Sequence, residues 1–354
     1  MATVTCIFGG YAVLTGVVLG HSSVNPLVFA AARDLVASIL LLSAAAISER
    51  RRGSSGGGGG EKVPRLLPAW SDAGSFLLLG LTGVWGAQGM SALAIKFSTP
   101  TFFAAMTNLQ PVVTFSLSLA LGLEPFRRGW ALSWLKVAAV AATAASGLSV
   151  VLLASAGGAA SITGASLNFP LGLAFSLVQI SLGGALPVVQ KPLFARYAPI
   201  VLCAWGYAVG TALLAMSVIT GATSAADWEG VTSATFLGGV AYAGVLSSAV
   251  AYAIMAAVNA AVSPTFVAVF MPGTAFWTVL FAWVFQGKRL APELWAPLAG
   301  IWLGVAALVA AQQFERRAAA GAKLDDAAAE KGEGGGGGGG GVARAALLDA
   351  YREM

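Results

Sequence analysis

The stretch that decides the fold is APIVLCAWGYAVGTALLAMSVI, residues 198–219, which contains no charged residue. The hydrocarbon core of a bilayer is about 30 Å thick, and about 20 residues of α-helix are needed to cross it. This stretch is therefore predicted to be a transmembrane helix. It is too long for a barrel strand and does not alternate polar with apolar residues, which excludes a transmembrane β-barrel.

Similar apolar stretches run through most of the chain and are separated by turns that contain proline. We predict an all-α membrane protein with ten transmembrane helices, at residues 2–20, 27–47, 73–93, 101–123, 131–153, 168–187, 198–219, 234–257, 264–285 and 294–313. The breaks between them include Asn25-Pro26, Ser98-Thr99-Pro100, Glu124-Pro125, Ala198-Pro199, Ser263-Pro264 and Ala291-Pro292.

The composition agrees with a membrane protein and argues against other classes. The chain is 57% hydrophobic and 10% charged, whereas a soluble domain carries roughly 25% charged residues. Its net charge of +5 comes from basic residues that flank the spans, so no nucleic-acid partner is expected and the lipid bilayer is the predicted partner. Both cysteines, Cys6 and Cys203, lie in apolar stretches, and His21 is the only histidine, so no metal and no cofactor are predicted.

The distribution of lysine and arginine predicts that both termini are cytoplasmic. With the N-terminus inside, the inner segments hold twelve basic residues, Arg50, Arg51, Arg52, Lys62, Arg65, Arg127, Arg128, Lys191, Arg196, Arg316, Arg317 and Lys323. The outer loops hold three, Lys96, Lys288 and Arg289, so the positive-inside rule favours this orientation. Residues 1–20 contain no basic residue, so we expect a retained first helix rather than a cleaved signal. The sequence does not distinguish a plasma membrane from a vacuolar endomembrane.

Two glycine tracts mark segments outside the membrane. One lies in the loop of residues 50–69 and the other in the tail of residues 316–354. Neither tract is followed by Lys-Ser or Lys-Thr, so neither is a phosphate-binding loop. Both segments are predicted to be disordered and cytoplasmic.

A pattern of residues occurs twice along the chain. The first copy is Gly83-Val84-Trp85, Ser98-Thr99-Pro100-Thr101-Phe102 and Gln110-Pro111, and the second is Gly244-Val245-Leu246, Val262-Ser263-Pro264-Thr265-Phe266 and Met271-Pro272. Two copies of five spans have opposite topology because five is odd. The sequence therefore predicts one repeat at residues 1–155 and a second, inverted repeat at 156–315. Secondary transporters are built on this plan, with a site near the midplane between the repeats.

Several motifs resemble those of the EamA-type drug/metabolite transporters, and most of all their plant nodulin-like, walls-are-thin branch. The motifs are GVWGAQG at 83–89, STPTFFA at 98–104 and NLQPVVTF at 108–115, supported by ARD at 32–34, ERR at 49–51, AW at 204–205 and SPTFVA at 263–268. The resemblance covers residues 7–315. It implies a bundle of two inverted EamA repeats that moves small organic solutes, such as amino acids or auxin-like compounds, by alternating access.

The chain departs from that family in the second repeat. Met271 stands where members often carry asparagine, and Gln286-Gly287-Lys288 replaces a glutamate that they favour. Glu124, the counterpart in the first repeat, is retained. These changes affect the expected substrate range rather than the architecture.

Arg33 and Asp34 are the charged residues that lie deepest in a predicted span. A charge near the bilayer centre costs about 2.5–3.5 kcal/mol on insertion scales, so each is expected to face a cavity or a partner. Arg33 is a candidate handle for an anionic substrate, and Asp34 a candidate partner or proton-coupling group. The alternative is structural, with Arg33 reaching the surface and Asp34 bonded to another helix. Because adjacent helical residues point about 100° apart, we do not expect the two to pair.

The fourth span holds Asn108 and Gln110 next to Pro111, and Thr114 one turn later. Proline removes a backbone donor, so carbonyl groups near Pro111 become available to a solute or to neighbouring helices. Pro272 is the corresponding position in the second half. Both prolines are candidate hinges, and static kinks are the alternative.

The remaining candidates for substrate binding are Gln88, Trp205, Tyr252 and Trp277. The two tryptophans lie deeper than an aromatic belt at the membrane surface, so they can wall a cavity. Glu124 is expected in a solvated cytoplasmic turn, with a gate latch as the alternative.

The sequence favours one of three function classes. A secondary transporter for a small organic solute fits best, moved by rocking of the two halves and with proton coupling left open. A polytopic membrane enzyme needs an acid–base pair, a nucleophile or metal ligands, and none is apparent. A channel needs a ring of like groups, which is also not apparent. A homodimer is left open.

Overall fold

The structure is a computed structural model and describes residues 1–21, 25–55, 67–97, 103, 106–124, 126, 130–154, 169–221, 224–287 and 292–333. Within these residues the regular structure is entirely helical. The first half contains α1 (Ala2–His21), α2 (Pro26–Ser55), η1 (Trp70–Asp72), α3 (Ala73–Gly80), η2 (Leu81–Gly89), α4 (Met90–Phe97), α6 (Gln110–Ala120) and α7 (Ala131–Ala154). The second half contains α8 (Phe169–Leu193), α9 (Pro199–Gly221), η4 (Ala225–Trp228), α10 (Ala234–Tyr242), η5 (Ala243–Val250), α11 (Ala251–Ala261), α12 (Pro264–Val269), α13 (Gly273–Gln286), η6 (Pro292–Leu294) and α14 (Trp295–Glu333).

Seven helical segments in the described part of the chain are long and apolar enough to cross a membrane. They are Pro26–Arg51, Ala131–Val150, Pro170–Leu193, Pro199–Gly221, Ala234–Ala261, Pro264–Phe285 and Pro292–Glu315. The first and fourth predicted spans also contain apolar helices, α1 and α6, and the third is helical from α3 to α4. The prediction of membrane helices is confirmed for seven segments, and ten crossings stay a prediction.

Apolar side chains on the outside of the bundle agree with a surrounding lipid phase. Ile219 is 75% exposed, Phe285 74% and Leu303 70%, and each lies on a different long helix. Many such side chains on one molecule are unusual at a surface that faces water. A bilayer solvates them at no cost, because lipid tails are as apolar as the protein interior.

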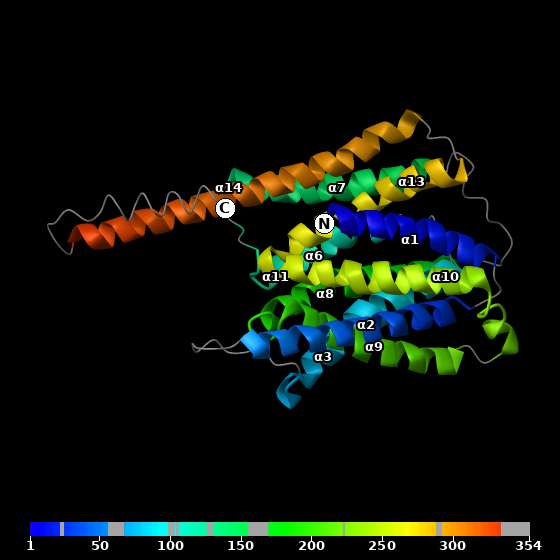
Figure 1. The fold of residues 1–354 in the computed structure, drawn as a ribbon. Coiled ribbons are helices and arrows are strands. Elements are labelled where there is room, and N and C mark those ends of the chain that lie inside the picture. Colours follow the sequence, from blue (N-terminus) through cyan, green and yellow to red (C-terminus); the bar gives the residue numbers. More distant parts are fainter. Residues whose placement is uncertain are drawn as a thin grey trace.

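The helices pack in layers (Figure 1). α7 and α14 lie side by side at one face, and α2, α3 and α9 form the opposite face. Between these faces lie α1, α8, α10 and α11, and α14 continues past the end of the bundle.

Three apolar cores hold this arrangement. The largest joins α2, α3, α8, α9, α10 and α11, and includes Phe29, Leu202 and Phe236. The second joins α6, α7, α12 and α14, and the third joins α7 to α13 and α14. Each core therefore combines helices from both halves of the sequence.

Two spans contain a wide π-helical turn at corresponding positions. η2 interrupts the third span and η5 interrupts the eighth. Close contacts to neighbouring helices occur here: a Cβ on Gly80 would lie 2.7 Å from Gly210 N, and one on Gly244 would lie 2.8 Å from Arg33 O. Glycine is therefore needed at both contacts for the helices to approach so closely.

Candidate functional site

A buried polar cluster at the centre of the largest core contains Arg33 and Asp34 of α2. Arg33 is 4% exposed and Asp34 is 0% exposed, so neither reaches the surface of the protein. Arg33 Nε lies 3.5 Å from Asp34 Oδ1. The expectation that the two would not pair was wrong, because the long arginine side chain can fold back although the two Cβ atoms diverge.

Arg33 also contacts uncharged groups. Its Nη2 donates a hydrogen bond to Gln88 Oε1 of η2, and its guanidinium carbon lies 4.8 Å from the centre of the Tyr11 ring. Gln88 Nε2 in turn donates to the hydroxyl of Tyr207 at 2.8 Å. This chain of contacts links α1, α2, η2 and α9. The cation–π contact and the neutral acceptor add to the ion pair with Asp34 in stabilising the buried guanidinium.

Asp34 connects α2 to the second half of the molecule. Ser248 Oγ of η5 donates to Asp34 Oδ1 at 2.9 Å, and Thr211 Oγ1 of α9 donates to Asp34 O at 3.3 Å. The hydroxyls of Ser38 and Thr211 lie 2.9 Å apart in the next turn. α2 therefore meets both α9 and η5 through polar contacts close to Asp34.

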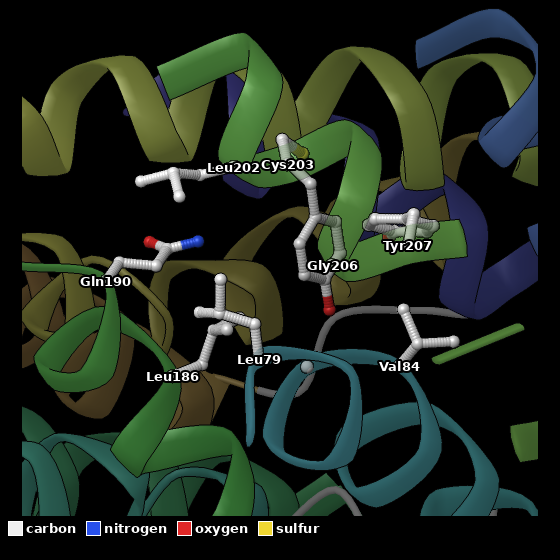
Figure 2. A pocket seen from close by; sticks show the side chains of 10 residues that line it. Leu79, Val84, Leu186, Gln190, Leu202, Cys203, Gly206 and Tyr207 are labelled. Atoms are coloured by element: carbon white, nitrogen blue, oxygen red, sulfur yellow. The ribbon is translucent and has the colours of Figure 1, made fainter. Parts of the chain in front are cut away.

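Aromatic rings close the cluster on one side. Tyr252 stands edge-on to Tyr207, with ring centres 5.3 Å apart, and edge-on to Phe8 of α1 at 5.8 Å. Both tyrosines also line a cavity, which Figure 2 shows between α8 residues such as Gln190 and Leu186 and α9 residues such as Cys203.

This cavity has a volume of about 20 Å³. Such a volume holds about one water molecule. An organic solute needs several times more space, so this cavity by itself cannot hold one.

Of the predicted substrate-binding residues, the structure brings together Arg33, Asp34, Gln88 and Tyr252. Trp205 is half-buried and packs against the largest core. Trp277 lies on α13 against α1 and stands edge-on to Phe276 at 5.3 Å. Its indole Nε1 is buried and has no hydrogen-bond partner among the described residues.

Asn108, Gln110 and Thr114 form a separate group at α6. Thr114 Oγ1 donates to Gly184 O of α8 at 2.8 Å, and Gln110 lies against Gly183 of the same helix. Asn108 is buried against Gly147 of α7. This group therefore joins α6 to α7 and α8.

The two candidate hinge prolines lie at breaks between helices. Pro111 sits in the first turn of α6, where its missing amide removes no helical hydrogen bond. Pro272 is the N-cap of α13, three residues after α12 ends at Val269. The expected kink in a continuous helix is therefore replaced by a break at each proline. Whether the breaks act as hinges stays a prediction.

A second buried cluster was missed from the sequence. Lys136 Nζ of α7 lies 3.0 Å from Glu124 Oε2 and 2.6 Å from Glu315 Oε2 of α14. The side chains of Lys136 and Glu124 are 1% and 2% exposed, so placing Glu124 in a solvated turn was wrong. A lone lysine inside a predicted apolar span was the signal, because such a charge requires a partner.

Lys191 is also engaged within the bundle. Its Nζ donates to Asn259 O at 2.7 Å and to Val262 O at 2.6 Å, which caps the carboxyl end of α11. Asn259 Nδ2 donates back to Pro187 O of α8 at 2.8 Å. Counting Lys191 as a loop cation overlooked this contact between two helix ends.

No metal centre appears in the described part of the chain. No group of three histidine, cysteine, aspartate or glutamate side chains there could hold an ion. Cys203 is buried and Cys6 half-buried, and both are free thiols.

Taken together, the apolar helices and outward-facing apolar side chains are those of an integral multi-pass membrane protein. No family model matches the sequence. The chain is similar to a WAT1-related protein of Arabidopsis thaliana, with 29% identity over 124 residues. That match covers 35% of this chain and 29% of the relative.

The fold is similar to that of one protein known from a crystal structure. The TM-score is 0.61 at 17% sequence identity, and the superposition covers 86% of this chain and 96% of the other. At this identity the likeness concerns the fold alone.

Proposed function

We propose that the chain is a secondary transporter of small organic solutes that works by alternating access. The observation that carries the proposal is the buried pair of Arg33 and Asp34, which lies where helices from both halves meet. Buried ionisable groups in membrane proteins usually face a partner or a substrate pathway.

An architecture of two inverted five-helix repeats is part of the proposal. Exchanging the first five spans with the last five maps several of the main helix contacts onto one another. The contacts of α1 with α13 correspond to those of α8 with α6, and the contacts of α3 with α9 correspond to those of α10 and η5 with α2. α2 pairs with α9 and α7 with α14, as expected for helices on a pseudo-two-fold axis.

Local features support the same correspondence. η2 and η5 are both π-helical, and the fourth and ninth spans both break beside a proline. Pro26 begins α2 as Pro199 begins α9, and Ser38 and Thr211 then occupy equal positions along the two helices. These two hydroxyls contact each other, as residues on a two-fold axis do.

The proposed solute carries a negative charge and an apolar or aromatic body. Arg33 would bind the charge, while Tyr11, Tyr207 and Tyr252 provide the walls. Gln88 and Ser248 would orient the charged groups. Asn108, Gln110, Thr114, Trp205 and Trp277 would line the pathway in a more open state.

Uptake into proteoliposomes tests this proposal with three labelled probes that share one aromatic body. Benzoate is an anion, phenylalanine a zwitterion and benzylamine a cation. We expect saturable uptake of benzoate, reduced about 10- to 100-fold by Arg33→Ala because a charge-assisted contact is lost. Arg317→Ala, at an exposed position on α14, is the matched control and should transport normally.

Other results would contradict the proposal in recognisable ways. Benzoate uptake that is equal in wild type and Arg33→Ala removes Arg33 from the site. Ionic current without saturation favours a channel, and a chemically altered probe favours an enzyme.

A further inference from the structure

The Arg33–Asp34 pair is incomplete on both sides. Arg33 Nε and Asp34 Oδ2 are buried, and neither has a hydrogen-bond partner among the described residues. The nearest approach, 3.5 Å from Nε to Oδ1, is too long for a hydrogen bond. The guanidinium remains in place through Gln88 and Tyr11. Its position therefore does not depend on a charged Asp34.

Asp34 has few donors for a buried carboxylate. The side chain is 0% exposed and accepts one hydrogen bond, from the neutral hydroxyl of Ser248. An unsatisfied buried polar atom costs about 1–3 kcal/mol, and more when it is charged. A proton on Oδ2 would remove that charge while the Ser248 bond to Oδ1 remains.

The surroundings of Asp34 contain no second acid or base of comparable kind among the described residues. The titratable groups packed around it are Arg33 on its own helix, Tyr11 of α1, Cys203 and Tyr207 of α9 and Tyr252 of α11. Gln88 of η2, Ser248 of η5 and Thr211 of α9 complete the shell and do not titrate. The cavity beside Tyr207 and Tyr252 has room for about one water molecule.

We propose that Asp34 is a proton-binding site that couples the movement of one proton to that of one anionic solute in the same direction. The empty site holds Arg33 positive and Asp34 negative, with no net charge. An anion bound to Arg33 beside a charged Asp34 would leave one excess negative charge in a low-dielectric interior, which is costly. Protonation of Asp34 Oδ2 forms an O–H bond and restores neutrality, so both the empty and the loaded site cross the membrane uncharged.

This inference rests on the proposed function, and it is tested by a measurement that does not depend on transport. The purified full-length protein in liposomes is labelled at the carboxyl carbon of aspartate. Infrared difference spectra are recorded as the pH falls from about 8 to about 4. The ligand whose binding is measured is the proton itself. We expect the wild-type protein to show the carbonyl band of a protonated carboxyl group. The band should be absent from Asp34→Asn. It should be present in the control, Asp227→Asn, which removes an aspartate near the surface instead.

A second variant keeps Asp34 in place and tests the direction in which the pH midpoint of the carbonyl band moves. Ser248→Ala removes the hydrogen bond that favours the carboxylate, so the midpoint of the band should move to higher pH by roughly 0.5 to 1 unit. Ser247→Ala, a buried neighbour in η5, is the control and should leave the midpoint unchanged.

The two proposals fail separately. Equal bands in wild type and Asp34→Asn overturn the proton site, as does an unchanged midpoint in Ser248→Ala, even if Arg33 still governs benzoate uptake. A confirmed band without any uptake leaves the proton site standing and contradicts the transport proposal.

Discussion

At the scale of single residues, buried charges are the most costly groups in this molecule, and each one is placed against specific partners. Lys136 stands between Glu124 and Glu315, while Arg33 rests on Gln88 and Tyr11. Removing one member of a buried ionic group costs more than the group contributes, because an uncompensated charge remains. The Lys136 cluster thus ties the segment after α6 and the middle of α14 to α7.

Lys136→Ala should destabilise the protein by about 3–5 kcal/mol, because two buried carboxylates lose their shared cation. A lower midpoint of thermal unfolding for the purified protein would report this. Replacing all three residues, with Lys136→Met, Glu124→Gln and Glu315→Gln together, should recover much of the loss. An unchanged midpoint in Lys136→Ala alone would mean that the cluster is solvated in the membrane.

At the scale of elements, helix contacts depend on small residues and on the places where helices are interrupted. The two π-helical turns widen η2 and η5 next to α9 and α2, and glycine allows each close approach. In membranes, such packing replaces the hydrophobic effect as the main attraction between helices.

Gly244→Ala should lower the thermal unfolding midpoint, because its Cβ would lie 2.8 Å from Arg33 O and 2.9 Å from Val36 Cβ. Overpacking of this kind costs about 1–3 kcal/mol. Gly238→Ala, on α10 just before η5, meets no atom within 4 Å and is the matched control. Equal loss in the two variants would show that glycine itself, and not the contact, matters at these positions.

Pro111→Ala should slow the turnover of benzoate more than it weakens binding. Without proline, α6 can extend backward through Leu109, and the break beside it is lost. Rates and half-saturation concentrations from proteoliposome uptake separate the two effects. Val112→Ala, at the next and 40% exposed position, should change neither. Weaker binding at an unaltered rate would exclude a hinge here.

At the scale of the whole molecule, the apolar cores do not follow the two halves of the sequence. The largest core unites α2 and α3 with α8 to α11, and the second unites α6 and α7 with α12 and α14. If the transporter rocks as rigid bodies, these mixed groups are better candidates for the moving units than residues 1–155 and 156–315. Buried apolar surface resists separation, so bodies move along the boundaries between cores rather than through them.

The two ends of the bundle should lie on opposite sides of the membrane. Trp70 is 96% exposed next to Asp72, which binds Arg196 at 2.5 Å just before α9 begins. Trp228 is 49% exposed beyond the other end of α9, beside the contact of Asn25 with Asp227. In a background of Cys6→Ser and Cys203→Ser, Trp228→Cys should react with an impermeant thiol reagent in intact cells. Trp70→Cys should react only after permeabilisation, and labelling of both from one side would contradict the proposed orientation.

The sequence by itself determined the helical, membrane-embedded character of the chain, because apolar length is a local property of each segment. It also singled out Arg33, Asp34, Gln88 and Tyr252 as unusual groups within apolar stretches. Only the tertiary structure decided what each polar group meets, since the partner depends on which helix faces which. The structure alone places Tyr207 against Gln88, Ser248 against Asp34 and Lys136 against Glu124. It places Asn108 against α7 and Gln110 against α8. A buried polar atom must be satisfied by whatever the neighbouring helix presents, and that neighbour comes from distant sequence.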